Sequence, residues 1–122
     1  GRPSVELWGT GTPRREFLFV DDLADGLLFL LRNYDADTTR HPFVNIGTGT
    51  DVTIAELAEL IRGVVGYGGK IEWNRSMPDG TPRKLLDVSR MQSMGWRAAT
   101  SFEAGLMRAY EWYRAEMHRG ME

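Results

Sequence analysis

The segment at residues 53–65, TIAELAELIRGVV, constrains the fold most, because it reads as an amphipathic helix with both ends marked. Thr53 and Glu56 have the T-x-x-E spacing of a capping box, in which each side chain bonds a free backbone N–H of the first turn. Apolar residues follow at helical spacing: Ile54, Leu57, Ala58, Ile61, Val64 and Val65. The glycine-rich GYGG ends the helix, and strands are predicted on both sides, at residues 43–46 and 70–74.

Strands and helices also alternate in the first third of the chain. Residues 5–8 alternate apolar with polar and predict a strand, and GTGTP predicts a turn whose glycines take positive φ. Residues 17–20 predict a second strand. A helix is expected at residues 22–33, capped by Asp21 or Asp22. It is apolar nearly all round, which is typical of burial on several sides.

The last third of the chain adds a loop and two helices. A loop stiffened by two prolines is expected at residues 76–84, and residues 34–41 are expected to form a polar loop. Ser89 with Gln92, and Thr100 with Glu103, resemble capping boxes that begin helices. The last helix has the apolar stripe Phe102, Leu106, Ala109, Tyr110, Tyr113 and Met117. The whole pattern, over residues 1–122, predicts one α/β domain of a small, α+β-like kind.

Composition excludes several classes of protein. The net charge is −2, so a general attraction to nucleic acid or to an anionic membrane is not expected. There are no cysteines, which rules out a disulfide framework and thiolate metal sites. No apolar run approaches the roughly 20 residues that span a bilayer. The sequence begins without Met and without a signal peptide, and we expect it to be a piece of a longer, cytoplasmic protein.

Common catalytic patterns are absent. Neither GTGT segment continues as G-x-G-x-x-G, and no G-x-S-x-G elbow occurs. His41 and His118 lie far apart in sequence without ligand spacing. Tyr67 and Lys70 are three residues apart, whereas short-chain dehydrogenases use a spacing of four. The Asp21–Asp22 pair is better explained as a helix cap than as an acid/base couple.

Two clusters of basic residues remain as candidate binding groups. Arg14 and Arg15 precede a strand and follow Trp8, whose indole suits stacking on a base or sugar. Arg83 and Lys84 close the proline-stiffened loop, which also carries Asp79. An arginine fork binds phosphate oxygens in a bidentate manner, so two such clusters closing on one diphosphate form one hypothesis. The alternative is two unrelated solvated turns, and physical reasoning leaves both open.

Three long stretches resemble a known family: VELWGTGTPRREFLFVDDLADGLLFLL, FVNIGTGTDVTIAELAELIRGVVGYGGKIEW and MPDGTPRKLLDVSRMQSMGW. They are similar to the C-terminal part of the GDP-L-fucose synthase family, from Val5 to about Tyr113. These are the 3,5-epimerase/4-reductases that make GDP-L-fucose from GDP-4-keto-6-deoxy-D-mannose. The R-x-F-x-x-V-x-D pattern is shared by extended short-chain dehydrogenases in general, whereas WGTGTPRREF and PDGTPRKLLDVSR are more specific.

The resemblance implies a parent enzyme that uses NADP(H), bound by an N-terminal Rossmann domain that this sequence lacks. It implies catalytic Ser, Tyr, Lys, Cys and His residues that have no match here, so we expect residues 1–122 to be inactive alone. It implies substrate contacts at Trp8, Arg15, Asp79 and Lys84, with Arg83 able to point toward the substrate or away. It also implies a homodimeric parent.

The same resemblance accounts for the apolar helix at residues 22–33, which would lie against the absent Rossmann half. The strand at residues 43–46 would pair with structure outside this sequence. We therefore expect the isolated chain to expose apolar surface, and to be marginally stable or to associate. Two other readings are open: the substrate domain of another nucleotide-sugar epimerase or dehydratase, and a non-catalytic module that binds nucleotide sugars or a protein.

Overall fold

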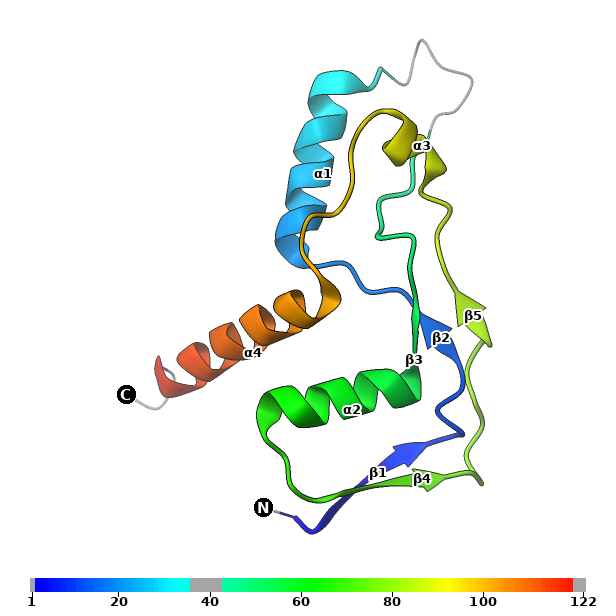
Figure 1. Cartoon of the computed structure of the whole chain (residues 1–122), viewed down its shortest axis with the longest axis vertical. Helices are drawn as coiled ribbons and strands as arrows, with labels where there is room; N and C mark the ends of the chain where they lie inside the picture. Colours follow the sequence, from blue (N-terminus) through cyan, green and yellow to red (C-terminus); the bar gives the residue numbers. More distant parts are fainter. Residues whose placement is uncertain (1, 36–42, 120–122) are drawn as a thin grey trace.

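The computed structural model describes residues 2–35 and 43–119, and it is an elongated mixture of short strands and four helices (Figure 1). The strands are β1 (Ser4–Trp8), β2 (Arg14–Arg15), β3 (Val52–Thr53), β4 (Lys70–Asn74) and β5 (Arg83–Lys84). The helices are α1 (Val20–Asn33), α2 (Ile54–Val65), α3 (Ser89–Ser93) and α4 (Phe102–Arg119). The expectation of a small mixed α/β unit is met.

The strands form two small sheets. β1 and β4 pair in parallel, from Ser4 opposite Lys70 to Trp8 opposite Asn74. β2 is the middle strand of the other sheet, antiparallel to β3 and parallel to β5. In Figure 1 the β1–β4 pair and α2 occupy one end of the molecule, α1 and α3 the other, and α4 projects to one side.

Helix α2 confirms the strongest prediction from the sequence. Thr53 is its N-cap, and both arms of the capping box are formed: Glu56 N donates to Thr53 Oγ1 at 3.0 Å, and Thr53 N donates to Glu56 Oε2 at 2.7 Å. Gly66 ends the helix in the left-handed conformation, with φ 68°. The predicted strands at residues 5–8 and 70–74 are also present, as β1 and β4.

The predicted strand at residues 17–20 is wrong. The ladder lies earlier, at Arg14–Arg15, and α1 begins at Val20. The aromatic residues between them serve packing instead: Phe17 stacks on Phe102 with ring centroids 5.3 Å apart, and Phe19 is the N-cap of α1. Residues 43–46 likewise form no strand. Side chains hold this segment, since Asn45 Nδ2 donates to Asp87 O and Arg90 Nη1 donates to Phe43 O.

The three remaining caps differ from the predictions. α1 has no side-chain cap, because buried Asp22 instead accepts from Thr100 N at 3.0 Å and Thr100 Oγ1 at 3.1 Å. With Thr100 engaged there, Ser101 Oγ takes the capping position before α4 and accepts from Ala104 N. α3 has no capping box at Ser89, whose N–H is bonded by Asp87. At α3 and α4 the oxygen of another residue bonds the backbone N–H, whereas at α1 the candidate carboxylate is engaged by Thr100.

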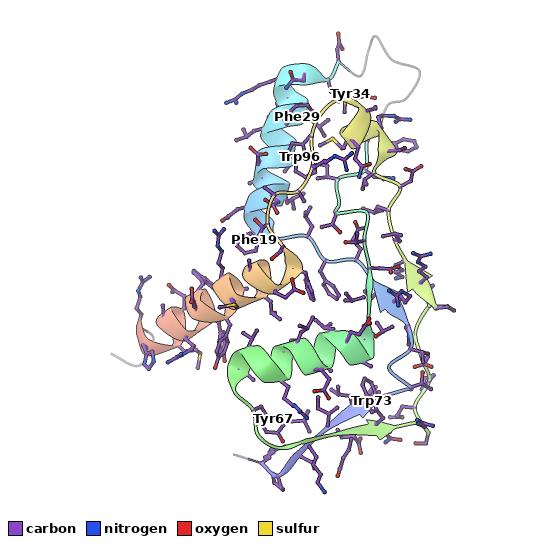
Figure 2. All side chains as sticks on the ribbon, viewed as in Figure 1. Phe19, Phe29, Tyr34, Tyr67, Trp73 and Trp96 are labelled. Carbon is purple, nitrogen blue, oxygen red and sulfur yellow. The ribbon has the colours of Figure 1, made fainter. Side chains whose placement is uncertain are left out.

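The buried apolar core within the described residues is small. It consists of Val88, Met91 and Trp96, which lie beside α1. Trp96 Nε1 donates to Asp25 Oδ2 at 2.8 Å, and Gly26 lets the indole approach, because a Cβ there would lie 3.0 Å from it. Figure 2 shows the aromatic side chains in separate groups, with Phe29 and Trp96 at the α1 end and Tyr67 and Trp73 at the β1–β4 end.

Much apolar surface is exposed, as the sequence led us to expect. α1 leaves Leu27 and Leu28 each 50% exposed and Leu31 81% exposed. The outer half of α4 exposes Trp112, Tyr113 and Met117, so only the first turns of its predicted stripe are covered. Association through these faces remains a prediction.

Candidate functional site

The turn after β1 brings the two basic segments of the sequence together. Asp79, from the loop before β5, reaches this turn and accepts from Thr10 N at 2.8 Å and from Thr10 Oγ1 at 2.7 Å. Gly9 and Gly11 have φ of 82° and 76°, so the expectation of positive φ is met. A Cβ at Gly9 would lie 2.2 Å from Asp79 Oδ1, so glycine is required there by space as well as by φ.

Those hydrogen bonds favour the ionised form of Asp79. The hydroxyl of Thr10, followed by its backbone N–H, lowers the pKa of the Asp79 carboxyl. Both carboxylate oxygens of Asp79 therefore accept bonds that hold its own loop against the turn. This geometry favours a role for Asp79 in ordering its loop, beside the substrate contact that the resemblance implies.

The register of the three-stranded sheet separates the four basic residues into two pairs. Arg14 lies opposite Arg83, and Arg15 lies opposite Lys84. Because successive side chains of a strand point to opposite faces, Arg14 and Arg83 share one face and Arg15 and Lys84 share the other. Residues that are neighbours in sequence thus belong to different sites.

Asp51 bridges Arg14 and Arg83 and offsets one of their two positive charges. Arg14 Nε lies 2.7 Å from Asp51 Oδ1 and Arg83 Nε lies 2.5 Å from Asp51 Oδ2. Arg14 Nη2 also donates to the backbone oxygen of Asp51 at 3.0 Å. The Asp51 side chain is only 4% exposed, and its pKa is lowered by hydrogen bonds from Arg83 and then Arg14. The hydrogen bond to Asp51 raises the pKa of Arg14 in turn.

The Arg15–Lys84 pair has no such partner. Within residues 2–35 and 43–119, no carboxylate lies within 4.0 Å of either cation. Arg15 Nη1 donates to Arg14 O at 2.7 Å, which steadies the guanidinium without neutralising it. Two adjacent cations of like charge repel each other, and an anion between them relieves that repulsion. This face is therefore suited to bind an anion.

Trp8 lies at the end of β1, directly before the turn that Asp79 holds. Its side chain is 66% exposed, which is unusual for an indole that serves only packing. The structure thus gives Trp8 an open ring face for a flat or apolar group.

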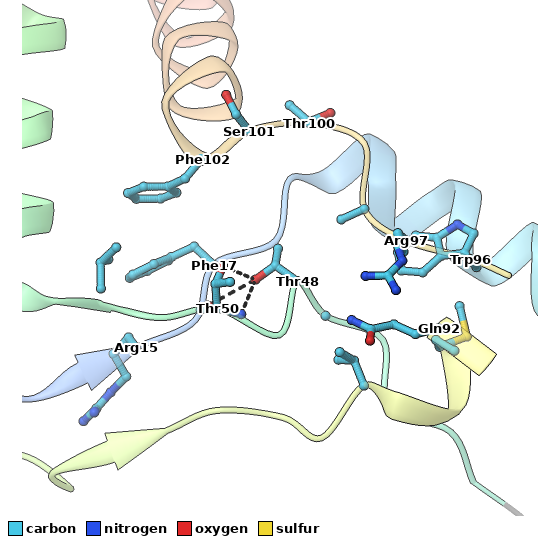
Figure 3. A pocket seen from close by; sticks show the side chains of 15 residues that line it. Arg15, Phe17, Thr48, Thr50, Gln92, Trp96, Arg97, Thr100, Ser101 and Phe102 are labelled. Atoms are coloured by element: carbon cyan, nitrogen blue, oxygen red, sulfur yellow. Dashed lines mark hydrogen bonds between the residues drawn. The ribbon is translucent and has the colours of Figure 1, made fainter. Parts of the chain in front are cut away.

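A pocket of about 260 Å³ extends from Arg15 toward α3 and the start of α4. Figure 3 shows Arg15 at one end, the stacked rings of Phe17 and Phe102 along one side, and Gln92, Trp96 and Arg97 at the other end. No motif in the sequence marked Arg97, and Gln92 was expected only as part of a capping box with Ser89. They reach this pocket only because residues 89–98 fold back toward the segment at residues 47–50.

Glu16 braces the same region and was not singled out from the sequence. Its Oε1 accepts from Gly49 N at 2.7 Å and from Thr48 Oγ1 at 3.2 Å. Its Oε2 accepts from Leu86 N at 3.0 Å. Its actual partners, from two distant segments, are visible only once the chain is folded.

No group of three or more His, Cys, Asp or Glu residues among the described residues is placed to hold a metal ion. Tyr67 Oη donates to Arg2 O, so its role is structural, and His118 is exposed on α4. His41 lies outside the described residues. No helix in the described part of the chain is long and apolar enough to cross a membrane.

Comparison with known proteins identifies relatives with this fold. Residues 1–47 match the NAD dependent epimerase/dehydratase family. The chain is 53% identical over 109 residues to "Probable GDP-L-fucose synthase 1" of Oryza sativa subsp. japonica, covering 89% of this chain and 32% of that protein. It is 46% identical to the GDP-L-fucose synthase of Escherichia coli, covering 96% of this chain and 38% of that one.

A solved structure supports the same assignment. A GDP-mannoheptose C4 reductase from Campylobacter jejuni with NADP bound superposes with a TM-score of 0.80 at 40% identity, covering 91% of this chain and 35% of that chain. This chain thus spans about a third of the length of the proteins it matches. By sequence and fold, this chain is similar to the GDP-L-fucose synthases, and its residues 1–47 match the NAD dependent epimerase/dehydratase family.

Proposed function

We propose that this chain is the substrate-binding domain, from the C-terminal part, of a GDP-L-fucose synthase. The longer protein would convert GDP-4-keto-6-deoxy-D-mannose to GDP-L-fucose with NADPH in the cytoplasm, as a homodimer. The similarity to proteins named for this activity supports the proposal. The observation that carries it within this chain is the Arg15–Lys84 pair, two adjacent cations with no carboxylate partner among the described residues.

In this proposal the diphosphate of GDP lies across Arg15 and Lys84. The guanidinium of Arg15 donates two parallel bonds, and the Lys84 ammonium adds a point charge. Trp8 packs against the base or the sugar. Asp79 holds the loop of Lys84 against the turn after β1, and we assign Arg83 to the bond with Asp51 instead of the substrate.

The contribution of such a domain to catalysis is orientation. Binding energy gained at the diphosphate, away from the reacting carbons, fixes the keto-sugar against the nicotinamide and the acid/base groups. We place NADP(H), the Rossmann domain and those catalytic groups in the rest of the longer protein. In support, the similar C4 reductase has NADP bound. Residues 1–122 alone are then inactive and only bind substrate.

The test is calorimetric titration of the chain with GDP-L-fucose, GDP and UDP-galactose at low salt, after circular dichroism has shown that it is folded. We expect binding of the two GDP ligands, and its loss in Arg15→Ala. Arg32→Ala, which removes an exposed arginine of α1, is the matched control and should bind as the wild type does.

Other outcomes separate the alternatives. Binding of UDP-galactose in preference to GDP would assign the chain to another nucleotide-sugar epimerase or dehydratase. Loss of binding in Arg32→Ala as well would show that GDP responds to general charge. A folded chain that binds none of the ligands would refute binding by this domain on its own.

A further inference from the structure

Asp51 joins the two strands that carry the unpartnered cations. One carboxylate oxygen lies 2.7 Å from Arg14 Nε on β2, and the other lies 2.5 Å from Arg83 Nε on β5. Arg15 and Lys84 are the next residues of these same strands and lie opposite each other. Asp51 thus contacts neither Arg15 nor Lys84, but it holds the residue beside each of them.

The strands need such a connection because they are very short. β2 and β5 have two residues each. Besides the ladder, a backbone bond from Arg14 N to Pro82 O at 2.8 Å joins them. A pair this short is marginal without side-chain support, and charge-assisted hydrogen bonds to one carboxylate are stronger than neutral ones.

Asp51 is itself held firmly by helix α2. It lies two residues before the N-cap Thr53, and the first free N–H groups of α2 are bonded to the turn after β1: Ile54 N donates to Pro13 O and Ala55 N donates to Gly11 O, each at 2.9 Å. The carboxylate therefore extends from a segment whose next residues are bonded through β3 and the start of α2, not from a free loop. A rigid anchor fixes the spacing of whatever it holds.

We propose that Asp51 is a positioning residue that sets the spacing of Arg15 and Lys84 for a diphosphate, by holding Arg14 and Arg83 on the opposite face of the sheet. The part that concerns the ligand rests on the proposed function. The part that concerns the strands does not, because it follows from the geometry of β2, β5 and Asp51 alone.

The direction in which one mutation changes GDP affinity separates this proposal from simple electrostatics. Asp51→Asn removes a negative charge close to the basic residues. If charge alone mattered, the variant would bind GDP more tightly. If Asp51 acts by positioning, the variant binds GDP more weakly, because Arg15 and Lys84 no longer keep the separation that a diphosphate needs.

The experiment uses Asp51→Asn and the control Glu59→Gln, which removes a carboxylate from the exposed Glu59–Arg62 pair of α2. The first readout is amide hydrogen exchange at Arg14 by NMR, which reports opening of the bond to Pro82. We expect exchange about 10-fold faster in Asp51→Asn and unchanged in Glu59→Gln. The second readout is GDP affinity, with an expected loss of about 10-fold in Asp51→Asn.

A double-mutant cycle with Arg15→Ala shows whether Asp51 acts through Arg15. If it does, Asp51→Asn costs little further affinity once Arg15 is absent, because coupled residues are not additive. Should Asp51→Asn fail to fold, Arg83→Gln removes one arm of the connection from a residue whose side chain is 60% exposed. Its expected result is the same faster exchange at Arg14.

Unchanged exchange at Arg14, or GDP affinity equal to or above that of the wild type, would overturn the proposal. Full additivity with Arg15→Ala would also overturn it, since Asp51 would then act independently of that site. If the wild-type chain binds no GDP, the proposed binding of substrate by this domain on its own fails. Faster exchange at Arg14 would still establish the link between the strands.

Discussion

The two faces of the β3–β2–β5 sheet carry the same kind of residue in opposite electrostatic states. On one face Arg14 and Arg83 share the carboxylate of Asp51, whose side chain is 4% exposed. On the other face Arg15 and Lys84 stand opposite each other without a carboxylate among the described residues. The difference teaches that a basic cluster in a sequence is not a site. Which of its members can bind a ligand depends on where the nearest carboxylate folds.

The largest effect on ligand binding is expected from removing Arg15, on the face without a carboxylate. Arg15→Ala is expected to weaken GDP binding at least 10-fold, since a hydrogen bond to a charged group contributes about 1.5–3 kcal/mol. Because Arg15 makes no ion pair, we expect the melting temperature of the Arg15→Ala variant to stay close to that of the wild type. Calorimetry and thermal denaturation, measured on the same preparations, test both statements.

Arg14→Ala provides the counterpart. We expect it to lower the melting temperature, because it leaves one side of the nearly buried Asp51 carboxylate without its partner. Equal losses of GDP affinity in Arg14→Ala and Arg15→Ala, with equal melting temperatures, would contradict the division of the cluster into two faces.

Gly9→Ala should disturb the loop that carries Asp79 and leads to Lys84. Its Cβ would lie 2.2 Å from Asp79 Oδ1, at a φ of 82° that alanine rarely adopts. We expect a loss of about 1–3 kcal/mol in the free energy of unfolding, by the usual cost of a strained backbone position. Urea denaturation measures it. Gly68→Ala is the control, because its Cβ would meet open space, and an equal loss there would refute the contact with Asp79.

Thr53→Ala should lower the stability of the fold and change GDP affinity little. It removes the N-cap of α2, and we expect a loss of about 1 kcal/mol in the free energy of unfolding. The face that carries Arg15 and Lys84 keeps all of its charges. GDP affinity per folded molecule should therefore change less than in Asp51→Asn. A greater loss of affinity in Thr53→Ala would show that the helix start matters more than the carboxylate.

Acidification should weaken the bonds of Asp51 to Arg14 and Arg83 and the bonds of Asp79 to Thr10. The pKa of Asp51 is lowered from its ordinary value of 3.8 by Arg83 and Arg14, and that of Asp79 is lowered by Thr10. A group with a depressed folded pKa stabilises the fold fully above its ordinary pKa, and this contribution is lost as pH falls through the folded value. The melting temperature should thus begin to fall once the pH drops below about 4.

The variant Asp51→Asn gives that pH dependence its control. Since it lacks one of the carboxylates whose pKa is lowered in the folded protein, its melting temperature should fall less steeply on acidification than that of the wild type. Thermal denaturation between pH 6 and 3 measures both slopes. Identical slopes would show that the bonds to Asp51 contribute nothing that depends on its charge.

Predictions from the sequence succeeded where the signal was local. The capping box at Thr53, the end of α2 at Gly66 and the positive φ of Gly9 and Gly11 all depend on residues within one turn of the chain. Predictions failed where a distant oxygen or ring competed. Thr100 bonds Asp22 instead of capping α4, and Phe17 packs on Phe102 instead of entering a ladder. A resemblance to a family supplied candidates for the site, and it did not show their partners.

The sequence by itself determined the elements whose stability is local, the exposure of an apolar α1, and the presence of two basic segments. Only the tertiary structure decided how those segments combine, because their pairing depends on contacts across more than thirty residues, as from Asp51 to Arg14 (|i−j| of 37) and to Arg83 (|i−j| of 32). The alternation of a two-residue strand then places neighbouring arginines on opposite faces. Local propensity does not show on which face of the sheet the Asp51 carboxylate lies. Because it lies on the face of Arg14 and Arg83, Arg15 and Lys84 remain open for a ligand.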